Sequence, residues 1–431
     1  MRIVKLKDCI LKILDYRGKT PQKLGSNWVS KGIKVISANN VHDGMLTNQN
    51  EIRYVTEEIY KKWMKEPVLR GDCFLSSEGA TLGESMYWDS EEKIVLGQRL
   101  YAIRTNPQVL DSKYFSMYLK SNICQKLIKS ISTGSTVFGI SQKDLLKLEI
   151  ILPELEIQRR IGILKYNIDK KIELNNKIND ELEAMAKTIY DYWFLQFEFP
   201  NEEGKPYKSS GGKMIWNEEL KREIPEGWEV NKLEEYISVI RGVNYKRDDV
   251  LSNKEINYIP LIKSNNIQNG QILFDDIIFV PQKLVNKNQI LNKNSVLMTM
   301  SSGSKEHMGK TTIIYDSLDY TFGAFCSKIE IIEDMRCFLS IFFRSALFKT
   351  LIDNITSGTN INNISNEHLY NIKMTIPNKK VLQKFEDILN PILDKQGIIQ
   401  KENQELTSLR DFLLPLLMNG QVGFKEDKAE G

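Results

Sequence analysis

The string most suggestive of catalysis is GSKEHMGKT at residues 303–311, which looks like a phosphate-binding loop. Such a loop needs four residues between its two glycines, so that successive backbone amides wrap around a phosphate. Five residues separate Gly303 from Gly309, and the related string SSEGATLGES at residues 76–85 has no lysine. We therefore interpret both strings as glycine-rich turns between strands and predict no nucleotide site.

Other catalytic signatures are missing as well. The sequence has no NPPY or DPPY tetrapeptide of an amino-methyltransferase and no GxGxxG to hold S-adenosylmethionine or a dinucleotide. Glu78 and Asp72 lack the PD…ExK spacing of a nuclease. The five cysteines and three histidines are scattered without the spacing of metal ligands. We predict no catalytic residue, metal or cofactor in this chain, so that catalysis belongs to a partner.

Short polar side chains and a few cations crowd the turn segments instead. Arginine and asparagine read guanine and adenine edges, while serine, threonine and lysine commonly hold phosphates. Asparagine and serine are also ordinary turn formers, so each residue has a purely structural alternative. The candidate DNA-binding residues are Arg17, Lys19, Asn39, Asn40, Ser76, Ser77, Ser132, Thr133, Ser135, Thr136, Arg241, Asn244, Ser264, Asn265, Asn266, Ser301, Ser302, Ser304 and Lys305.

These segments occur twice in the chain. SANNVHDG at residues 37–44 returns as KSNNIQNG at residues 263–270, which places Asn39 over Asn265 at an offset of 226. RGKTP at Arg17 returns as RGVNY at Arg241, and ISTGSTVFGIS at residues 131–141 returns as ITSGTNINNIS at residues 355–365, both at an offset of 224. A repeat this long predicts two copies of one architecture.

Composition and charge fit such a chain. With 431 residues, 41% hydrophobic and 27% charged, it is long enough for several folded domains. The excess of positive charge lies in residues 1–150, with 23 basic and 16 acidic residues. That excess suits a domain approaching phosphates, although a solvated lysine-rich surface has the same charge. We expect no membrane segment and a cytoplasmic location.

Each copy begins with strands and ends with helices. Short apolar runs between Asn, Gly and Ser, such as IKVISANN, DCFLSSEG and RLYAIR in the first copy and IPLIKSNN, SVLMTMSSG and CSKIEII in the second, predict strands of a mixed α/β fold. Apolar spacing of three and four predicts one helix at residues 113–131 and one at 337–355.

A long helical pattern follows Pro153 and again Pro377. Its narrow apolar stripe is typical of a coiled coil, and polar Asn175, Asn179 and Asn403 on the stripe would set its register. Pro391 and Gly397 interrupt the second pattern near its start, and Pro415 near its end. The helices could pair parallel or antiparallel, as a spacer of roughly 60 Å between two similar heads. The predicted seam comprises Ile161, Leu164, Ile168, Ile172, Leu182, Ile189, Ile388, Ile392, Ile399, Leu406, Leu409 and Leu413.

The helical segments resemble the specificity subunit of type I restriction-modification systems. The resemblance is carried by GISQKDLLKLEIILPELEIQRRIGILKYNIDKKIELNNKINDELEAMAKTIYDYWFLQFEF with GGKMIWNEELKREIPEGWEV, and by NISNEHLYNIKMTIPNKKVLQKFEDIL with LTSLRDFLLPLLMNGQV. It implies an α+β fold with a pseudo-two-fold repeat, in which two mixed α/β target-recognition domains are separated by two long antiparallel coiled-coil helices. The implied boundaries are recognition domains at 1–152 and 229–376, helical spacers at 153–199 and 377–419, a linker at 200–228 and a tail at 420–431.

The resemblance also implies partners and a function. Each recognition domain would read one half of a split sequence in double-stranded DNA. Two methylation subunits, carrying S-adenosylmethionine, would methylate adenine at N6, and restriction subunits would join for cleavage. The alternatives are a scaffold that joins proteins through its helices without reading DNA, and a fused DNA-modifying enzyme with unrecognised motifs.

Overall fold

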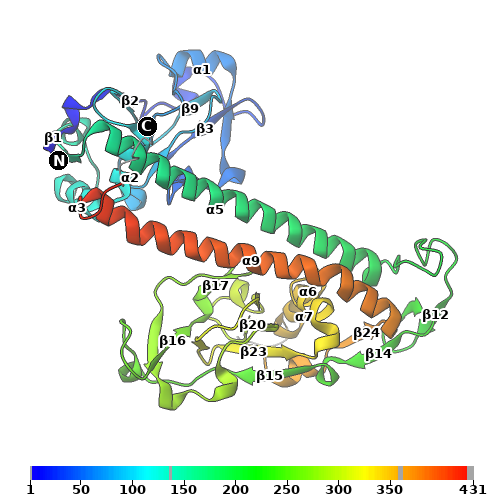
Figure 1. The fold of residues 1–431 in the computed structure, drawn as a ribbon. Coiled ribbons are helices and arrows are strands. Elements are labelled where there is room, and N and C mark those ends of the chain that lie inside the picture. Colours follow the sequence, from blue (N-terminus) through cyan, green and yellow to red (C-terminus); the bar gives the residue numbers. More distant parts are fainter. Residues whose placement is uncertain (1, 135–137, 358–362, 425–431) are drawn as a thin grey trace, which may run out of the picture. The chain divides into compact units, whose positions relative to one another are not determined.

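The computed structural model describes residues 2–134, 138–357 and 363–424. The chain divides into two compact units. Unit 1 comprises Met1–Glu173 with Gln404–Gly431, and unit 2 comprises Leu174–Asn403. Each unit therefore holds one strand-rich head together with part of each of two long helices, α5 (Leu155–Tyr190) and α9 (Lys379–Met418) (Figure 1).

The head of unit 1 is built on two small sheets and two ribbons. Its four-stranded antiparallel sheet has the order β2-β10-β7-β8, and a three-stranded sheet has the order β6-β3-β9, with β3 and β9 parallel. Central strand β10 is buried along most of its length, as its apolar run LYAI requires. The strands are β1 (Arg2–Lys5), β2 (Ile10–Asp15), β3 (Ile33–Ile36), β4 (Val41–His42), β5 (Met45–Leu46), β6 (Arg53–Val55), β7 (Cys73–Ser76), β8 (Ser85–Tyr87), β9 (Ile94–Leu96), β10 (Leu100–Thr105) and β11 (Glu149–Leu152).

The head of unit 2 repeats this topology strand for strand. Its sheets have the orders β15-β23-β20-β21 and β19-β16-β22, and β14 pairs with β24 as β1 pairs with β11. The repeat in the sequence is thus a repeat of strand order. The strands are β14 (Glu229–Lys232), β15 (Ile237–Arg241), β16 (Tyr258–Ile262), β17 (Ile267–Gln268), β18 (Gln271–Ile272), β19 (Ile278–Pro281), β20 (Ser295–Thr299), β21 (Thr311–Ile314), β22 (Thr321–Phe322), β23 (Cys326–Ile331) and β24 (Lys373–Ile376).

The turns interpreted as glycine-rich connections are placed as predicted. Residues 77–84 join β7 to β8, and residues 300–310 join β20 to β21. In the second of these turns the Gly309 amide donates to the Thr299 carbonyl at 3.0 Å, which closes it as a strand connection.

The single helix predicted near the end of each head is wrong in both copies. Each segment forms two helices, α2 (Ser112–Lys120) and α3 (Asn122–Ile131) in unit 1, and α6 (Arg336–Phe342) and α7 (Ala346–Ser357) in unit 2. The break falls at Ser121 and at Ser345. Each serine hydroxyl accepts a hydrogen bond from an amide of the following helix, from Cys124 at 3.2 Å and from Phe348 at 3.1 Å. A serine cap thus starts a new helix where apolar spacing alone suggests continuation. The remaining short α-helices are α1 (Glu57–Trp63), α4 (Gln142–Leu145) and α8 (Asn366–Tyr370).

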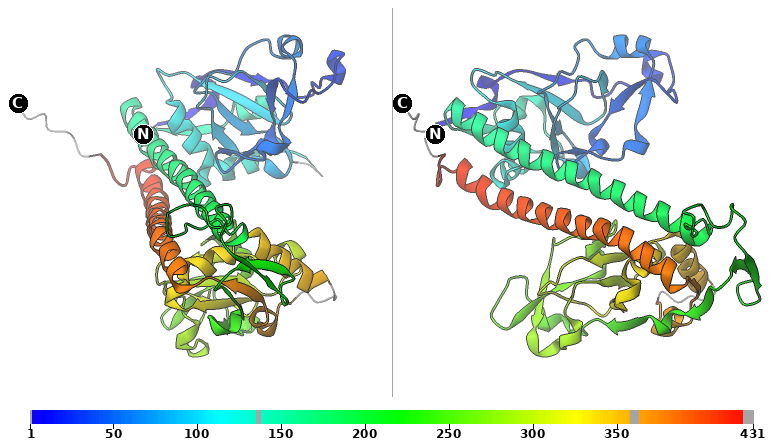
Figure 2. Two further views of the ribbon diagram at one scale, coloured as in Figure 1. Left: turned by 90° about the vertical axis from the view of Figure 1, so that its right-hand side faces the viewer. Right: turned by 45° about the vertical axis from the view of Figure 1, so that its right-hand side comes forward.

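Helices α5 and α9 run antiparallel within each unit (Figures 1 and 2). In unit 1, Arg410 pairs with Asp169 at 3.2 Å, while Ile161 shares a buried cluster with Leu417. In unit 2, the Asn175 amide donates to Asn403 Oδ1 at 2.8 Å, and Gln396 donates to the Asn179 carbonyl at 3.3 Å. The polar seam residues therefore meet one another, as a register-setting role requires.

Most of the predicted seam residues are buried or partly buried, but two are exposed. Ile161, Ile168 and Ile399 are buried, and Leu164, Ile172, Leu182, Ile189, Ile392, Leu406 and Leu413 are partly buried. Ile388 and Leu409 are exposed at 45% and 46%. The next residue faces inward in each case: Leu389 is buried and Arg410 pairs with Asp169. At these two positions the inward face of α9 is therefore shifted by one residue from the predicted apolar stripe.

Neither Pro391 nor Gly397 ends α9, which is continuous through both. Leu389 and Leu393 on either side of the proline are completely buried, so packing of the apolar face offsets the lost backbone hydrogen bond. Gly397 lies against unit 2's own sheet. A Cβ atom at this position would come within 2.7 Å of Tyr315 Cβ, so the helix can approach that closely only with glycine here.

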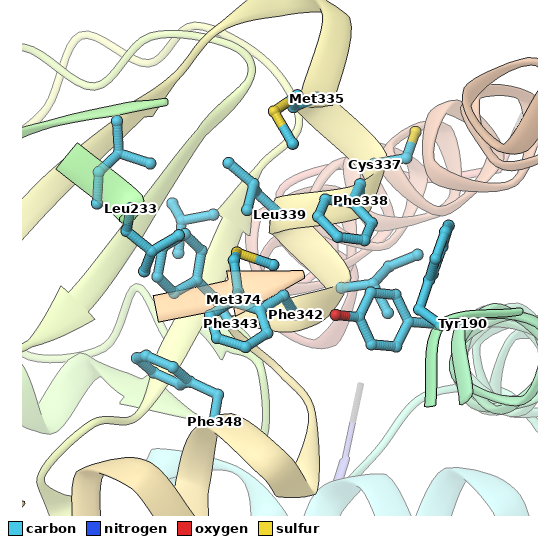
Figure 3. Close-up of a cluster of buried hydrophobic side chains, with 14 of the residues drawn as sticks. Tyr190, Leu233, Met335, Cys337, Phe338, Leu339, Phe342, Phe343, Phe348 and Met374 are labelled. Atoms are coloured by element: carbon cyan, nitrogen blue, oxygen red, sulfur yellow. The ribbon is translucent and has the colours of Figure 1, made fainter. Parts of the chain in front are cut away.

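A large aromatic core holds the helices of unit 2 to its head. Phe194 lies 4.7 Å from Phe338 and 4.6 Å from Phe385, ring centroid to centroid, in edge-on contacts. Figure 3 shows Tyr190 of α5 among Phe338, Phe342 and other side chains of the head. Unit 1 has its own core, in which Tyr114, Phe115 and Tyr118 of α2 pack with the last turns of α9.

Residues 200–228, predicted as a linker, are ordered. They contain a hairpin, β12 (Met214–Asn217) with β13 (Arg222–Pro225), and Trp228 stacks on Phe199 at 5.1 Å. All five cysteines are buried, and burial raises the pKa of Cys124 and Cys326 to about 12. Across the described ranges no helix combines the length and the apolar character needed to cross a bilayer.

Candidate functional site

The repeated polar turns gather at one edge of the sheets in each unit. In unit 1, β10 starts at this edge, whereas antiparallel β2 and β7 end there, since Tyr101 pairs with Asp15 and Leu100 with Ser76. The parallel strands β3 and β9 also end at a shared edge, at Ile36 and Leu96. The segments after these strands are the ones that carry the candidate residues.

A short turn at residues 97–99 connects the two sheets and the polar segments around it. The Ala38 amide donates to the Gln98 carbonyl at 3.1 Å, and the Gly18 amide donates to Gln98 Oε1 at 2.9 Å. The Ser77 amide donates to the Arg99 carbonyl at 2.9 Å. Three predicted segments, which begin at residues 17, 37 and 76, therefore converge on this turn.

Unit 2 uses the same framework at residues 323–325. The Gly323 amide donates to the Ile262 carbonyl at 2.9 Å, as the Gly97 amide donates to Ile36 at 2.7 Å. The fourth segment joins in both units as well. Ile140 donates to the Ser77 carbonyl at 2.8 Å, and the matched bond from Ile364 to Met300 is 2.7 Å. We call this edge, with its four segments, the turn edge of each unit.

Each unit has two adjacent asparagines at the turn edge, and they do different things. Asn40 and Asn266 are buried, at 5% and 3% exposure. Asn266 accepts from the Lys263 amide at 2.9 Å and donates to the carbonyls of Leu273 and Asp275. Asn40 makes the matched bonds in unit 1. The DNA-binding prediction is therefore wrong for these two residues, whose amides hold the hairpin that follows them.

Asn39 and Asn265, by contrast, are exposed. Within the described part of the chain, neither side chain makes a hydrogen bond. Both amide groups are therefore free to bond to an external partner. They occupy matched positions, each directly before the buried asparagine of its own unit.

Arg17 and Lys19 are engaged within unit 1. The Arg17 guanidinium pairs with Asp15 at 2.8 Å and lies 4.3 Å above the Tyr101 ring. Burial raises the pKa of Asp15, but hydrogen bonds from Arg17 outweigh it and hold that pKa below its usual value. Lys19 donates to the Trp63 carbonyl, and burial lowers its pKa. Both cations already have intramolecular partners, which favours the structural alternative for them.

The serine and threonine candidates of unit 1 are mostly structural. Ser76 and Ser77 are completely buried, so the prediction is wrong for them. Their hydroxyls bond to Thr81 and Arg17. Ser132 donates to the Lys129 carbonyl at 2.7 Å, whereas Thr133 is exposed and pairs through its backbone with Gly139. Ser135 and Thr136 lie outside the described residues.

The candidates of unit 2 are more accessible. Arg241, Asn244 and Ser304 are exposed, while Ser264, Ser301 and Ser302 are partly buried. Arg241 donates to the Ile364 carbonyl at 3.3 Å, and the Ser302 hydroxyl accepts from the Ser304 amide at 3.2 Å. The Lys305 side chain lies outside the described part.

Residues that the sequence analysis missed line a groove at the turn edge of unit 1. This groove has a volume of about 710 Å³ and includes Arg53 and Arg99 beside Asn39. Arg53 lies 5.2 Å above the Trp28 ring. Arg99 lies two residues after Gly97 and directly before β10. The position of Arg99 at the start of the predicted strand RLYAIR was therefore the signal in the sequence that could have identified it. Guanidinium, amide and indole groups in one groove form a surface suited to bases and phosphates.

Comparison with known proteins shows the family of the chain. A family model described as type I restriction modification DNA specificity domain matches residues 1–184 and 225–408. The chain belongs to this family. The two matched stretches correspond to the two copies of the repeat.

Individual relatives in this family are similar to parts or nearly all of the chain. The EcoKI specificity subunit of Escherichia coli (strain K12) is 31% identical over 204 residues, which cover 46% of this chain and 44% of that protein. The chain thus spans less than half the length of this relative. The MjaVIII specificity subunit of Methanocaldococcus jannaschii is 23% identical over 434 residues, covering 98% of this chain and 93% of that protein.

The fold is shared with a solved specificity subunit. The S subunit of a type I restriction-modification system from M. genitalium has a TM-score of 0.60 at 16% identity, covering 96% of this chain and 95% of that one. At this identity the likeness concerns the fold alone.

Proposed function

We propose that this chain is the DNA-recognition subunit of a type I restriction-modification complex and that each head reads one half of a split target. The observation that carries the proposal is the turn edge, because one framework of backbone hydrogen bonds presents exposed Asn39 in one unit and exposed Asn265 in the other. Asparagine is a side chain that reads adenine in the major groove.

The backbone hydrogen bonds of the turn edge are shared by the two units, but the exposed side chains on it differ. A target with two different half-sites requires such a difference. Unit 1 carries Arg53 and Arg99 in one groove with its asparagine. Arg241 of unit 2 matches Arg17, but Asn244 stands where unit 1 has Thr20. Two heads of one strand order with different exposed groups would read two different half-sites. This pattern supports recognition of a bipartite sequence.

The same proposal assigns the catalytic steps to partners. Two methylation subunits holding S-adenosylmethionine would bind this chain and methylate adenine at N6 within each half-site, and restriction subunits would cleave. We place this complex in the cytoplasm. Support comes from the family membership together with the missing methyltransferase and nuclease motifs in the sequence.

The paired helices are proposed as an antiparallel coiled-coil spacer in a pseudo-two-fold repeat. Helices of 36 and 40 residues measure about 54 and 60 Å at 1.5 Å per residue. The Asn175–Asn403 pair and the Arg410–Asp169 pair fix their register within each unit. A fixed register would give the target a fixed spacing between its half-sites.

Mapping of adenine methylation by single-molecule sequencing tests this function. The chain would be expressed with its methylation subunits in cells that lack other adenine methylation, and compared with cells that lack only this chain. We expect methylation at one split sequence that disappears without the chain. Methylation that persists at the same sequence without the chain would contradict sequence reading. Binding of S-adenosylmethionine by the isolated chain would favour the fused enzyme, and indifference of the complex to DNA would favour the scaffold.

A further inference from the structure

The turn before the central strand makes a matched backbone hydrogen bond in both units but ends in a different side chain. The Ser77 amide donates to the Arg99 carbonyl at 2.9 Å, and the Met300 amide donates to the Phe325 carbonyl at 2.8 Å. β10 begins directly after Arg99 and β23 directly after Phe325. Arg99 and Phe325 are therefore the same position of the repeat.

Both side chains point away from the protein. The Arg99 side chain is 56% exposed, and Phe325 is 65% exposed. A phenylalanine is normally buried, so its exposure in a turn one residue before the buried strand β23 is not explained by packing. Arg99 also has a φ of +58°, in the left-handed region that non-glycine residues rarely adopt. Residues in this region occur in turns and cluster at functional sites.

An ion pair with Glu78 holds Arg99 in unit 1. Arg99 Nε lies 3.3 Å from Glu78 Oε1, and a Cβ atom at Gly79 would lie 3.5 Å from Arg99 Nη1. The carboxylate engages the inner nitrogen of the guanidinium. Because a guanidinium carries five N–H donors, most of them remain available for an external acceptor. The side chain borders the same groove as exposed Asn39.

These observations rest on the proposed function and deepen it. We propose that this position determines specificity in both heads, with Arg99 reading a guanine in one half-site and Phe325 contacting a thymine methyl in the other. An arginine fork matches the O6 and N7 acceptors of guanine, and an apolar side chain such as phenylalanine contacts the C5 methyl of thymine. One framework thus reads a different base in each half of the target.

Methylation mapping of single variants of the chain, in complex with its methylation subunits, tests the assignment. Arg99→Ala should lower discrimination at one G·C position of one half-site by about tenfold to a hundredfold and leave the other half-site unchanged. Phe325→Ala should relax one A·T position in the other half-site. Phe325→Arg should convert that position toward G·C.

Two matched controls lie at the opposite end of the heads. Lys7 is an exposed cation before β2, and Ile332 is an exposed apolar residue directly after β23. A strand of six residues spans roughly 20 Å, so both are far from the turn edge of their own unit. Lys7→Ala and Ile332→Ala should leave the methylated sequence unchanged.

Three results would overturn the assignment. In the first, Arg99→Ala and Phe325→Arg methylate the wild-type sequence with unchanged preference at every position. In the second, Arg99→Ala loses methylation that Arg99→Lys restores with the original preference, which would make Arg99 a phosphate contact. In the third, Phe325→Ala releases the methylation subunits without changing base preference, which would make Phe325 a protein contact. If the wild-type complex methylates no split sequence, the proposed function itself fails.

Discussion

At the scale of single residues, the two adjacent asparagines of each head differ: one has a structural role, and for the other we propose a role in recognition. The buried one accepts from the start of its turn and donates to the strand that returns. The exposed one has no hydrogen bond from its side chain within the described ranges. Because both residues are asparagines at adjacent positions, the effects of replacing each one can be compared directly.

Replacing each asparagine by alanine should separate the two roles. Asn40→Ala should lower the free energy of unfolding by about 1–3 kcal/mol, because it leaves the Ser37 amide and the hairpin carbonyls without a partner. Asn39→Ala should leave stability within about 0.5 kcal/mol and weaken specific DNA binding. Denaturant unfolding and binding to target DNA measure both. Equal destabilisation by the two variants would contradict this division.

A second residue-scale feature concerns how each head caps its first helix after the sheet. In unit 1, the Tyr114 amide donates to Asp111 Oδ1 at 2.9 Å, and Gly162 of α5 leaves room for that carboxylate. In unit 2 the matched position of the long helix, 224 residues later, is Glu386. Its carboxylate accepts from the Cys337 and Phe338 amides, both at 2.9 Å.

In unit 1 the cap of α2 thus comes from Asp111 in the head itself. In unit 2 the cap of α6 comes from Glu386 on the long helix α9. Glu386→Ala should lower the free energy of unfolding by about 1–3 kcal/mol, because two buried amides lose their acceptor. Asp387→Ala, one residue later on the exposed face, is the matched control and should change stability by less than about 0.5 kcal/mol. Similar unfolding midpoints for the two variants would rule out a cap at Glu386.

At the scale of elements, the seam between α5 and α9 contains a polar layer. Asn175 is almost completely buried and donates to both Glu402 and Asn403, while Asn403 donates to Asn176. A buried polar pair of this kind costs stability relative to leucine and favours one register.

Leucine substitutions test the polar layer. Asn403→Leu alone should destabilise the protein, because it removes one acceptor of the buried Asn175 amide. The double variant Asn175→Leu with Asn403→Leu should be more stable than the wild type by on the order of 1 kcal/mol. Thermal unfolding of the two single variants and the double variant forms a cycle that measures the coupling. Additive effects would show that the asparagines do not act as a pair.

Within unit 1, Asp89 ties the head to α5. It accepts from Tyr166 and pairs with Arg70 at 2.8 Å. Burial raises the pKa of Asp89, but the hydrogen bonds from Tyr166 and Arg70 outweigh it and hold the pKa below the usual 3.8. Its ionised form therefore stabilises the folded state above about pH 3.8, and this contribution is lost as pH falls through the lowered value.

Acid titration of stability checks this contact. The difference in unfolding free energy between wild type and Asp89→Asn should stay constant from pH 7 to about pH 4 and shrink below it. Urea unfolding at each pH measures the difference. A difference that grows as the pH falls below 4 would mean that the carboxylate is not stabilised by its partners.

At the scale of the whole chain, the sequence predicted the repeat, both long helices and the six strands β3, β7, β10, β16, β20 and β23, because apolar periodicity and turn residues act locally. It could not separate Asn39 from Asn40, since burial depends on where the next hairpin returns. It also missed Arg99 and Phe325, because their significance comes from a sheet edge formed by strands distant in sequence. The breaks at Ser121 and Ser345 show how one capping hydroxyl overrides an apolar pattern.

The central claim is that each unit reads its own half of one target, and footprinting of the purified complex tests it most directly. With its methylation subunits bound, the chain should protect two separated stretches of bases. Asn39→Ala should weaken one stretch alone and Asn265→Ala the other alone. A single continuous protected stretch, or loss of the same stretch in both variants, would contradict the claim.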